Sequence, residues 1–511
     1  TFAWLRYRFS PDQLHHDMLA RPGFARHLEV TRLVGTSTVR AKAPVVRPKA
    51  ARDGHQLDAP QVAWRLGAAR SEHVWVICEQ GVYLVGPPRS GKGFGVLTAA
   101  IVEAPGAVVT TSTRTDNMEA TVAARAEQGP VYLFDPEGVS GRENTLRWSP
   151  IIGCEDPVVA QRRAATLVAR TGLGEGENAP WAVSAGGIIQ CLLHAAAVSG
   201  RTVHDLHSWS TSPARAREAV ALLEHHTPER WSVTLEAIQN EDPRMRSNKW
   251  FGVETAFKAL DVAGVRDMFD VTADDPDRFD PERFLTDIGT LYLVSRWREG
   301  SETGVSVGGF FSLLLDDIAE AARRLSQRPE YMGRLDPPAT FVLDEIANIH
   351  PWPSLPRAMS AGGGEGLQVV VAFQSRSQAR DAYGPNVERS MWESAYKVLL
   401  GGGSDAEDLR DLSGLLGEQD KVRLSASWQG VTPGTHSEQH ITTALVSADE
   451  LRRLPEGVAL LLAGRARPIL VELEPWPQRP WAHKVHASKS WHQANPVHPG
   501  LPAPLYSAAD S

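Results

Sequence analysis

The stretch from Gly81 to Leu97, GVYLVGPPRSGKGFGVL, constrains the fold more than any other part of the chain. Val82–Val85 predict a buried strand, and an apolar helical pattern begins after the glycine-rich turn. Gly86 and Gly91 flank four residues and Lys92 follows, which is the spacing of a phosphate-binding loop. Such a loop needs glycines because successive backbone N–H groups must turn inward toward phosphate oxygens. The stretch therefore predicts a nucleotide site.

We expect this loop to bind ATP, with Lys92 reaching the β- and γ-phosphates and the following helix adding its positive N-terminal end. Gly93 stands where Ser or Thr normally ligates Mg²⁺, which is a departure from the general motif. The alternative is a glycine-rich turn between a strand and a helix of any α/β protein. The predicted binding residues are Gly86, Pro87, Pro88, Arg89, Ser90, Gly91, Lys92, Gly93 and Phe94.

A carboxylate pair, Asp344 and Glu345, ends the apolar run FVLDE. Such a pair at the end of a buried strand is costly unless charged groups lie nearby. In proteins with a phosphate loop the first carboxylate holds Mg²⁺, and the second orients or deprotonates the attacking water. Gln374 ends the next apolar run, where its amide could position that water. With Lys92, these residues predict an additional-strand ATPase of the kind found in ring-shaped motors, although DE at a strand end also serves as an ordinary helix cap.

Strands and helices alternate from about residue 73 to residue 135, which predicts a parallel sheet with crossover helices. Between about residues 147 and 283 strand-like runs are few and helical periods are many, so we expect an all-helical domain inserted into the α/β domain. Its tryptophans serve either as core anchors of helix packing or as stacking surfaces for single-stranded nucleic acid. The sheet resumes at residues 290–295, and the strand-like runs VRLSASW and HITTALV suggest a hairpin.

The predicted organisation has five parts. They are an N-terminal helical lead and extended linker over residues 1–60, the first part of the nucleotide-binding domain over 61–146, the helical domain over 147–285, the second part of the nucleotide-binding domain over 286–475, and a tail over 476–511 that is disordered or wraps a neighbour.

Composition excludes some classes of protein. The net charge of −8 over 511 residues argues against a surface that is basic throughout, although it leaves room for a local basic channel. Three cysteines without metal-ligand spacing indicate a reduced compartment. We find no run of the ~20 apolar residues that a membrane span needs. The chain opens at Thr1 without a methionine, so we expect a trimmed sequence.

The chain resembles the type IV coupling proteins, the TraG/TraD-like ATPases of conjugative DNA transfer. The resemblance covers roughly residues 60 to 475 and is carried by GPPRSGKGFG, LDEIANI, GLQVVVAFQSRSQARDAYG and KVLLGGGSDAEDLRDLSGLLG. It implies an α/β fold, with a RecA-like P-loop ATPase domain built on a parallel sheet and an inserted all-helical domain. ATP and Mg²⁺ are the implied cofactors, with Lys92, Glu345 and Gln374 catalytic and with Mg²⁺ resting on Asp344 and the phosphates.

The resemblance also implies a homo-hexamer at the cytoplasmic face of the bacterial inner membrane, anchored by segments upstream of Thr1. Its partners would be single-stranded DNA or a relaxase–DNA complex, and components of the type IV secretion channel. Two alternatives stay open, a nucleotide-gated substrate receptor with little ATPase activity and a DNA translocase of the wider ring-motor group.

The chain departs from the family in one respect. Many members place an arginine eleven residues before the strand-end glutamine, where it reaches the ATP of the neighbouring subunit. Here that position is Gly363, so the resemblance leaves Arg357, Arg376 or Arg389 as a substitute, or weak stimulation between subunits.

Overall fold

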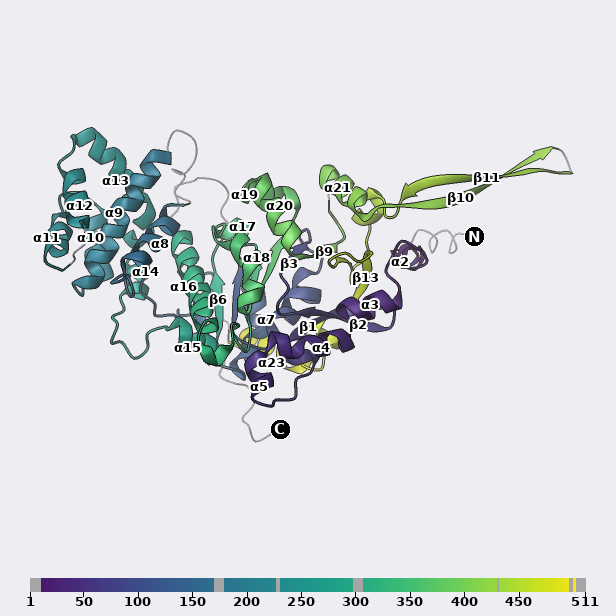
Figure 1. Cartoon of the computed structure of the whole chain (residues 1–511), viewed down its shortest axis with the longest axis horizontal. Coiled ribbons are helices and arrows are strands. Elements are labelled where there is room, and N and C mark those ends of the chain that lie inside the picture. The colour runs from purple at the N-terminus through teal and green to yellow at the C-terminus, as the bar shows by residue number, and fades with distance from the viewer. Residues whose placement is uncertain are drawn as a thin grey trace.

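The computed structural model describes residues 11–169, 179–226, 230–296, 307–403, 405–429, 432–495 and 500–501. An eleven-stranded sheet runs through its centre in the order β2-β1-β13-β12-β9-β3-β8-β7-β4-β6-β5 (Figure 1). The strands are β1 (Ala63–Ala69), β2 (Glu72–Ile77), β3 (Val82–Val85), β4 (Val108–Ser112), β5 (Val131–Phe134), β6 (Thr290–Val294), β7 (Ala339–Asp344), β8 (Leu367–Phe373), β9 (Tyr396–Leu400), β12 (Val458–Leu462) and β13 (Ile469–Leu473).

The seven strands from β9 to β5 are all parallel. They are short apolar runs buried on both faces, which is typical of parallel sheets covered by crossover helices. Strand β8 lies between β3, which leads into the phosphate loop, and β7, which ends in the carboxylate pair. The predicted α/β class, the parallel sheet and the additional strand are therefore confirmed.

Helices cover both faces of the sheet. They include η2 (Gly93–Leu97), α6 (Thr98–Val102), α7 (Asp116–Ala126), α16 (Gly308–Ser326), α17 (Ile346–Ile349), α18 (Leu355–Glu365), α19 (Arg376–Tyr383), α20 (Pro385–Ser394), α21 (Ala406–Leu416) and α22 (Ala448–Arg452), together with the single turns η1 (Ala59–Gln61), η5 (Pro329–Tyr331) and η6 (Trp476–Gln478).

The other edge of the sheet is antiparallel, which the strand–helix alternation did not predict. Strand β12 runs antiparallel to β9 and β13, β13 pairs with β1, and β1 pairs with β2. The β1–β2 hairpin turns at Arg70 and Ser71, whose φ angles are 52° and 64°. Two successive positive φ angles match the right-handed twist of paired strands, so this tight turn closes a hairpin without glycine.

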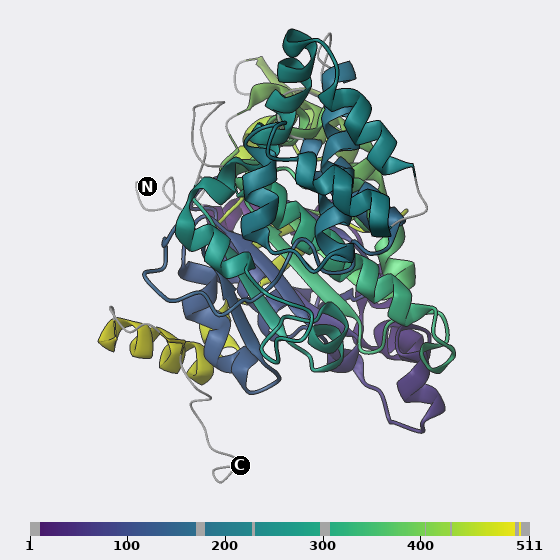
Figure 2. The same cartoon turned by 90° about the vertical axis from the view of Figure 1, so that its left-hand side faces the viewer.

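An all-helical domain lies between β5 and β6 in sequence and at one end of the molecule in space (Figures 1 and 2). Trp209 and Trp250 are buried in it, and the Trp250 indole donates to the carbonyl of Ser210 at 2.8 Å. These two tryptophans are therefore core anchors. The helices are α8 (Pro157–Val168), α9 (Ala179–Val198), α10 (Val203–Ser210), α11 (Arg217–His226), α12 (Trp231–Gln239), α13 (Pro243–Phe257), η4 (Lys258–Asp261), α14 (Ala263–Phe269) and α15 (Pro281–Thr286).

Within the described ranges one helix, at Pro180–Val198 in α9, is long and apolar enough to cross a membrane by length and composition. About half of it is buried inside the helical domain. A central helix of a helical bundle meets the same criterion, so this helix is accounted for by its packing.

The extended linker predicted before residue 60 is wrong. Helices α2 (Pro11–Leu19), α3 (His27–Val34), α4 (Thr36–Val46) and α5 (Pro48–Arg52) occupy this region. Val39, Ala43 and Val46 recur at helical spacing and are buried, so α4 gains its stability from packing on β2. Pro48 opens α5 at the first helical position, where a missing N–H costs nothing. The proline-rich composition therefore misled the sequence reading.

The tail is also structured where it was expected to be irregular. Helix α23 (Ala482–Ala494) packs along α7 and buries Val485, Ser488 and His492 (Figure 2). Its buried face is small and weakly apolar, which is why hydrophobic periodicity did not reveal it. Residues 496–499 and 502–511 lie outside the described part of the chain.

The predicted hairpin is confirmed. Strands β10 (Glu418–Gln429) and β11 (Thr432–Ala444) pair antiparallel and form a two-stranded sheet of their own. The ribbon projects away from the body of the molecule, on the side opposite the helical domain (Figure 1).

Candidate nucleotide-binding site

The phosphate loop runs from the end of β3 to the first turn of η2. Its start is fixed to the sheet, because the N–H of Gly86 donates to the carbonyl of Phe373 in β8 at 3.0 Å. Arg89 and Gly91 have φ angles of 64° and 84°, and the N–H of Gly95 donates to the carbonyl of Gly91 at 2.8 Å. Left-handed residues within such a turn direct successive N–H groups inward, as anion binding requires.

The two glycines at the ends of the loop have different physical roles. A Cβ atom at Gly86 would meet Ser90 Oγ at 2.7 Å and Lys92 Cγ at 2.9 Å, so the loop closes tightly only over glycine. A Cβ atom at Gly93 would have Asn117 Oδ1, at 3.8 Å, as its nearest neighbour. The backbone therefore leaves room for the side chain that Gly93 lacks.

Lys92 lies opposite the first carboxylate, with its Nζ 3.8 Å from Asp344 Oδ1. Burial raises the pKa of Asp344 to about 6, with Lys92 opposing the shift and Glu345 adding to it. Among the described residues, neither Asp344 Oδ1 nor Ser90 Oγ has a hydrogen-bond partner, although both atoms are buried. Buried polar atoms left unpaired are costly, so a charged ligand between them would satisfy both.

The donor set suits Mg²⁺ better than a metal held by protein alone. Across the described ranges, no group of three His, Cys, Asp or Glu side chains could hold a metal ion. Mg²⁺ is commonly bound through one or two carboxylates, waters and substrate phosphates, which is what Asp344 beside a phosphate loop provides. The residues present therefore fit Mg²⁺ bound together with a nucleotide.

Glu345 has a φ angle of 54°, which is rare for a residue with a side chain, and it caps the short helix α17. Its carboxylate accepts a hydrogen bond from the hydroxyl of Thr113, just beyond β4. The sequence analysis missed Thr113, just beyond β4, and Asn117, in the first turn of α7, both of which touch the site. Their position after the run GAVVTTS, at the carboxyl end of a parallel strand, was the available signal.

Gln374 follows β8, and its own N–H donates to Gln378 Oε1 at 2.9 Å. Its side chain lines a cavity of about 380 Å³ with Pro87, Pro88 and Asp405. Since β8 pairs with β3 and with β7, the structure brings the ends of these three strands together, and with them Lys92, Asp344, Glu345 and Gln374.

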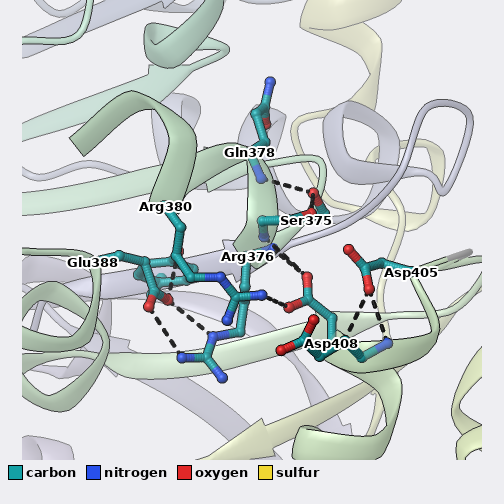
Figure 3. A network of polar contacts seen from close by, with 10 residues as sticks. Ser375, Arg376, Gln378, Arg380, Glu388, Asp405 and Asp408 are labelled. Carbon is teal, nitrogen blue, oxygen red and sulfur yellow. Dashed lines mark hydrogen bonds and ion pairs between the residues drawn. The ribbon is translucent and has the colours of Figure 1, made fainter. Parts of the chain in front are cut away.

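The three arginines proposed as substitutes differ in their surroundings. Arg376 makes two hydrogen bonds to buried Glu388, at 2.9 and 3.1 Å (Figure 3). Its guanidinium also lies over the Trp392 ring, 4.3 Å from the centroid. It is held within its own subunit and is a poor donor to a neighbour. Arg357 and Arg389 are exposed.

Gly363 itself cannot hold an arginine without rearrangement. A Cβ atom there would lie 1.9 Å from the carbonyl oxygen of Glu79, so α18 packs directly on the backbone after β2. Gly363 lies inside α18 and is not among the glycines with a positive φ, so the close backbone contact is what requires a glycine here. This contact is a physical reason why the family's arginine is absent from position 363.

Comparisons with known proteins agree with this geometry. Residues 36–221 match the model of the type IV secretory system conjugative DNA transfer family, and residues 338–456 match that of the TraM recognition site of TraD and TraG. Together the two matches cover more than half of the chain. None of the curated protein sequences matches it.

Solved structures share the fold. The unbound conjugative coupling protein TrwB, in a form named TrwBdeltaN70, superposes with a TM-score of 0.61 at 19% identity over 88% of this chain and 93% of that chain. TrwB in complex with ADP and Mg²⁺ gives a TM-score of 0.56 at 19% identity over 78% and 85%. At such identity the likeness establishes the fold alone.

Gly93→Ser should tighten binding of Mg²⁺-ATP about tenfold, the scale of one added hydrogen bond to a charged group, because the hydroxyl gains a place beside the metal without steric cost. Titration calorimetry with Mg²⁺ and with EDTA measures the effect. Gly93→Ala is the matched control, since it changes the helix in the same way without adding a ligand. Equal effects of the two substitutions would contradict the prediction.

Asp344→Asn should raise the melting temperature of the nucleotide-free chain at pH 8 and leave it unchanged near pH 4. The raised pKa means that the folded chain binds this proton more tightly than the unfolded chain. The charged carboxylate therefore destabilises the fold above about pH 6, and this cost disappears as the pH falls. Asp116→Asn, at an exposed position, is the control. A variant less stable than the parent at pH 8 would show that the pair with Lys92 dominates.

Arg376→Ala should destabilise the fold by about 3–5 kcal/mol, because it leaves the carboxylate of Glu388 buried without its ion-pair partner and with the hydroxyl of Tyr83 as its remaining donor. Arg389→Ala, in the neighbouring helix α20 and exposed, should stay within about 0.5 kcal/mol of the parent. Chemical denaturation measures both. Similar small losses of unfolding free energy for the two variants would contradict the prediction. Arg376 would then again be a candidate for contacting the ATP of a neighbouring subunit.

Proposed function

The chain belongs to the type IV coupling proteins of conjugative DNA transfer, and on this premise we propose that it hydrolyses ATP with Mg²⁺ to move DNA or nucleoprotein toward a secretion channel. The observation that carries the proposal is the convergence of Lys92, Asp344, Glu345 and Gln374 at the ends of β3, β7 and β8. These strands are hydrogen-bonded neighbours, so the four side chains share one edge of the sheet. The boundaries of the five-part division given above stay part of this proposal, with helices α2–α5 in place of the extended linker and α23 within the tail.

Each side chain has a distinct role in the proposed reaction. The Lys92 ammonium binds the β- and γ-phosphates, and the inward N–H groups of the loop neutralise further charge. Glu345 orients the attacking water and accepts its proton, for which it must leave or share the hydrogen bond from Thr113. The Gln374 amide holds that water from the other side. Mg²⁺, held by Asp344, would supply charge stabilisation at the phosphates.

Known structures of TrwB support the choice of cofactors. That protein has been solved with ADP and Mg²⁺, with a non-hydrolysable ATP analogue and with a non-hydrolysable GTP analogue. We extend nucleotide and Mg²⁺ binding to this chain because its loop has the required backbone geometry and because, within the described part of the chain, the buried atoms Asp344 Oδ1 and Ser90 Oγ have no hydrogen-bond partner.

We place the working protein at the cytoplasmic face of the bacterial inner membrane, as a homo-hexamer anchored by segments upstream of Thr1. Its substrate is single-stranded DNA or a relaxase–DNA complex, and its other partners are components of the secretion channel. Because ring motors of this architecture act at subunit contacts, assembly and turnover should be coupled. The helical domain, at one end of the molecule, is the proposed substrate-facing part (Figure 1).

A second function, that of a nucleotide-gated receptor with little hydrolysis, is favoured by one observation. The backbone contact at Gly363 excludes the family's arginine, and Arg376 is bound to Glu388. A site without a cation from the neighbouring subunit lacks a contribution that elsewhere is worth 10³–10⁵-fold in rate. The rate of ATP turnover by the assembled parent chain decides between the two functions.

Lys92→Ala should abolish ATP binding, whereas Glu345→Gln should keep it and slow hydrolysis by roughly 10²-fold or more, the scale expected for loss of a general base. Steady-state turnover, with and without single-stranded DNA, and separate binding measurements test the pair. Parental turnover in Lys92→Ala would exclude this loop as the site. Binding without detectable turnover in the parent, at every protein concentration, would favour the receptor.

A further inference from the structure

A group of aromatic rings lies directly beside the phosphate loop, with Phe94 and His486 exposed and with Trp476 half-buried, its ring 5.9 Å from Lys489 Nζ. Phe94 is the second residue after Lys92, in the first turn of η2, and 51% of it is exposed. The Trp476 ring lies 6.1 Å from the Phe94 ring at 75°, and the His486 ring lies 4.8 Å from that of Trp476. We call Phe94, Trp476 and His486 the aromatic patch. Its members come from the loop helix, from the turn after β13 and from α23, so only the folded chain assembles it.

Contacts of η2 with β13 and of Arg479 with β1 and α6 hold the patch in place. A Cβ atom at Gly95 would lie 3.1 Å from Leu473, so η2 rests closely on the end of β13. Three residues beyond Trp476, the buried Arg479 donates to Glu103 Oε1 at 2.8 Å and to the carbonyl of Arg65 at 2.9 Å. These bonds fix the segment after β13 against β1 and α6. The indole of Trp476 is therefore positioned before any ligand arrives, which lowers the cost of binding.

The geometry of the loop gives the direction of a bound nucleotide. The γ-phosphate has to lie near Lys92, Asp344 and Gln374. The cavity of about 380 Å³ lies beside the γ-phosphate end of the nucleotide, because Gln374 lines it. Position 93 faces Asn117, on the side of the carboxylates. The next residue, Phe94, instead contacts Trp476, in the turn after β13. The nucleoside end of the ligand therefore leaves the loop over the first turn of η2, toward the aromatic patch.

We propose that the aromatic patch binds the base of the nucleotide by stacking, so that the C-terminal segment completes the ATP site. The proposal rests on the proposed function, since it places the base of the nucleotide whose phosphates the loop binds. Aromatic rings recognise the π-face that all bases share, and such stacking is tolerant of base identity. The site therefore accepts ATP and GTP with similar affinity, and most of the nucleoside's contribution comes from Phe94 and Trp476.

The test compares ATP, GTP and inorganic triphosphate, each with Mg²⁺, by titration calorimetry on the full chain. Phe94→Ala and Trp476→Ala should each weaken ATP and GTP about tenfold or more and leave triphosphate unchanged. Phe94→Trp should retain parental affinity, because it restores a stacking surface. Phe251→Ala is the matched control, since Phe251 is a similarly exposed phenylalanine, 58% accessible, on α13 of the helical domain.

The outcomes separate this inference from the proposed function. A parent that binds neither ATP nor triphosphate would refute the loop itself, and with it the base site. Parental ATP affinity in both Phe94→Ala and Trp476→Ala would overturn the patch while leaving the loop intact. An equal loss of ATP and triphosphate would also overturn it, because the rings would then be shaping the loop. A change in assembly without a change in affinity would make the patch a contact between subunits.

Discussion

The parallel hydrogen bonding of β3, β8 and β7 is the constraint on which the rest of this structure depends. Parallel strands end at the same edge of a sheet, so residues far apart in sequence become neighbours without any side chain pairing them directly. The bond from the Gly86 N–H to the carbonyl of Phe373 fixes the loop to β8 at this edge. If β8 did not lie between β3 and β7, then Lys92, the carboxylate pair and Gln374 would not lie side by side.

Charge and strain are concentrated at that edge. Asp344 is buried with an elevated pKa, Glu345 has left-handed backbone angles, and its carboxylate is bound by Thr113. The buried carboxylate of Asp344 and the left-handed backbone of Glu345 each cost free energy in the absence of ligand, whereas the bond from Thr113 offsets part of that cost. Such costs persist where a site is arranged for a bound charge, and a phosphate–Mg²⁺ group would remove the cost of burying the Asp344 carboxylate. The site is therefore built for a ligand, at the expense of the stability of the empty chain.

The C-terminal segment packs both on strand β1 and on the helices that follow the phosphate loop. Arg479 is buried against Glu103 and β1, and α23 packs on α7. Strand β13 is an inner strand of the antiparallel edge, so the chain after it returns across the sheet toward the start of the loop helix. The segment after β13, which its composition marks as irregular, thus lies beside the phosphate loop. The proposed contact of Trp476 with a nucleotide base depends on this placement.

Sequence alone determined the phosphate loop, the carboxylate pair, the order of strands and helices around them and the helical insertion, because glycine spacing and apolar periodicity are local properties. The tertiary structure decided what depends on contacts between distant residues. It added an antiparallel edge, turned a proline-rich stretch into helices, and brought Thr113 and Asn117 to the site. It also bound Arg376 to Glu388 and set Gly363 against the carbonyl of Glu79. A close approach of two backbones leaves no periodic pattern along the chain, so only the folded molecule could reveal why that glycine is there.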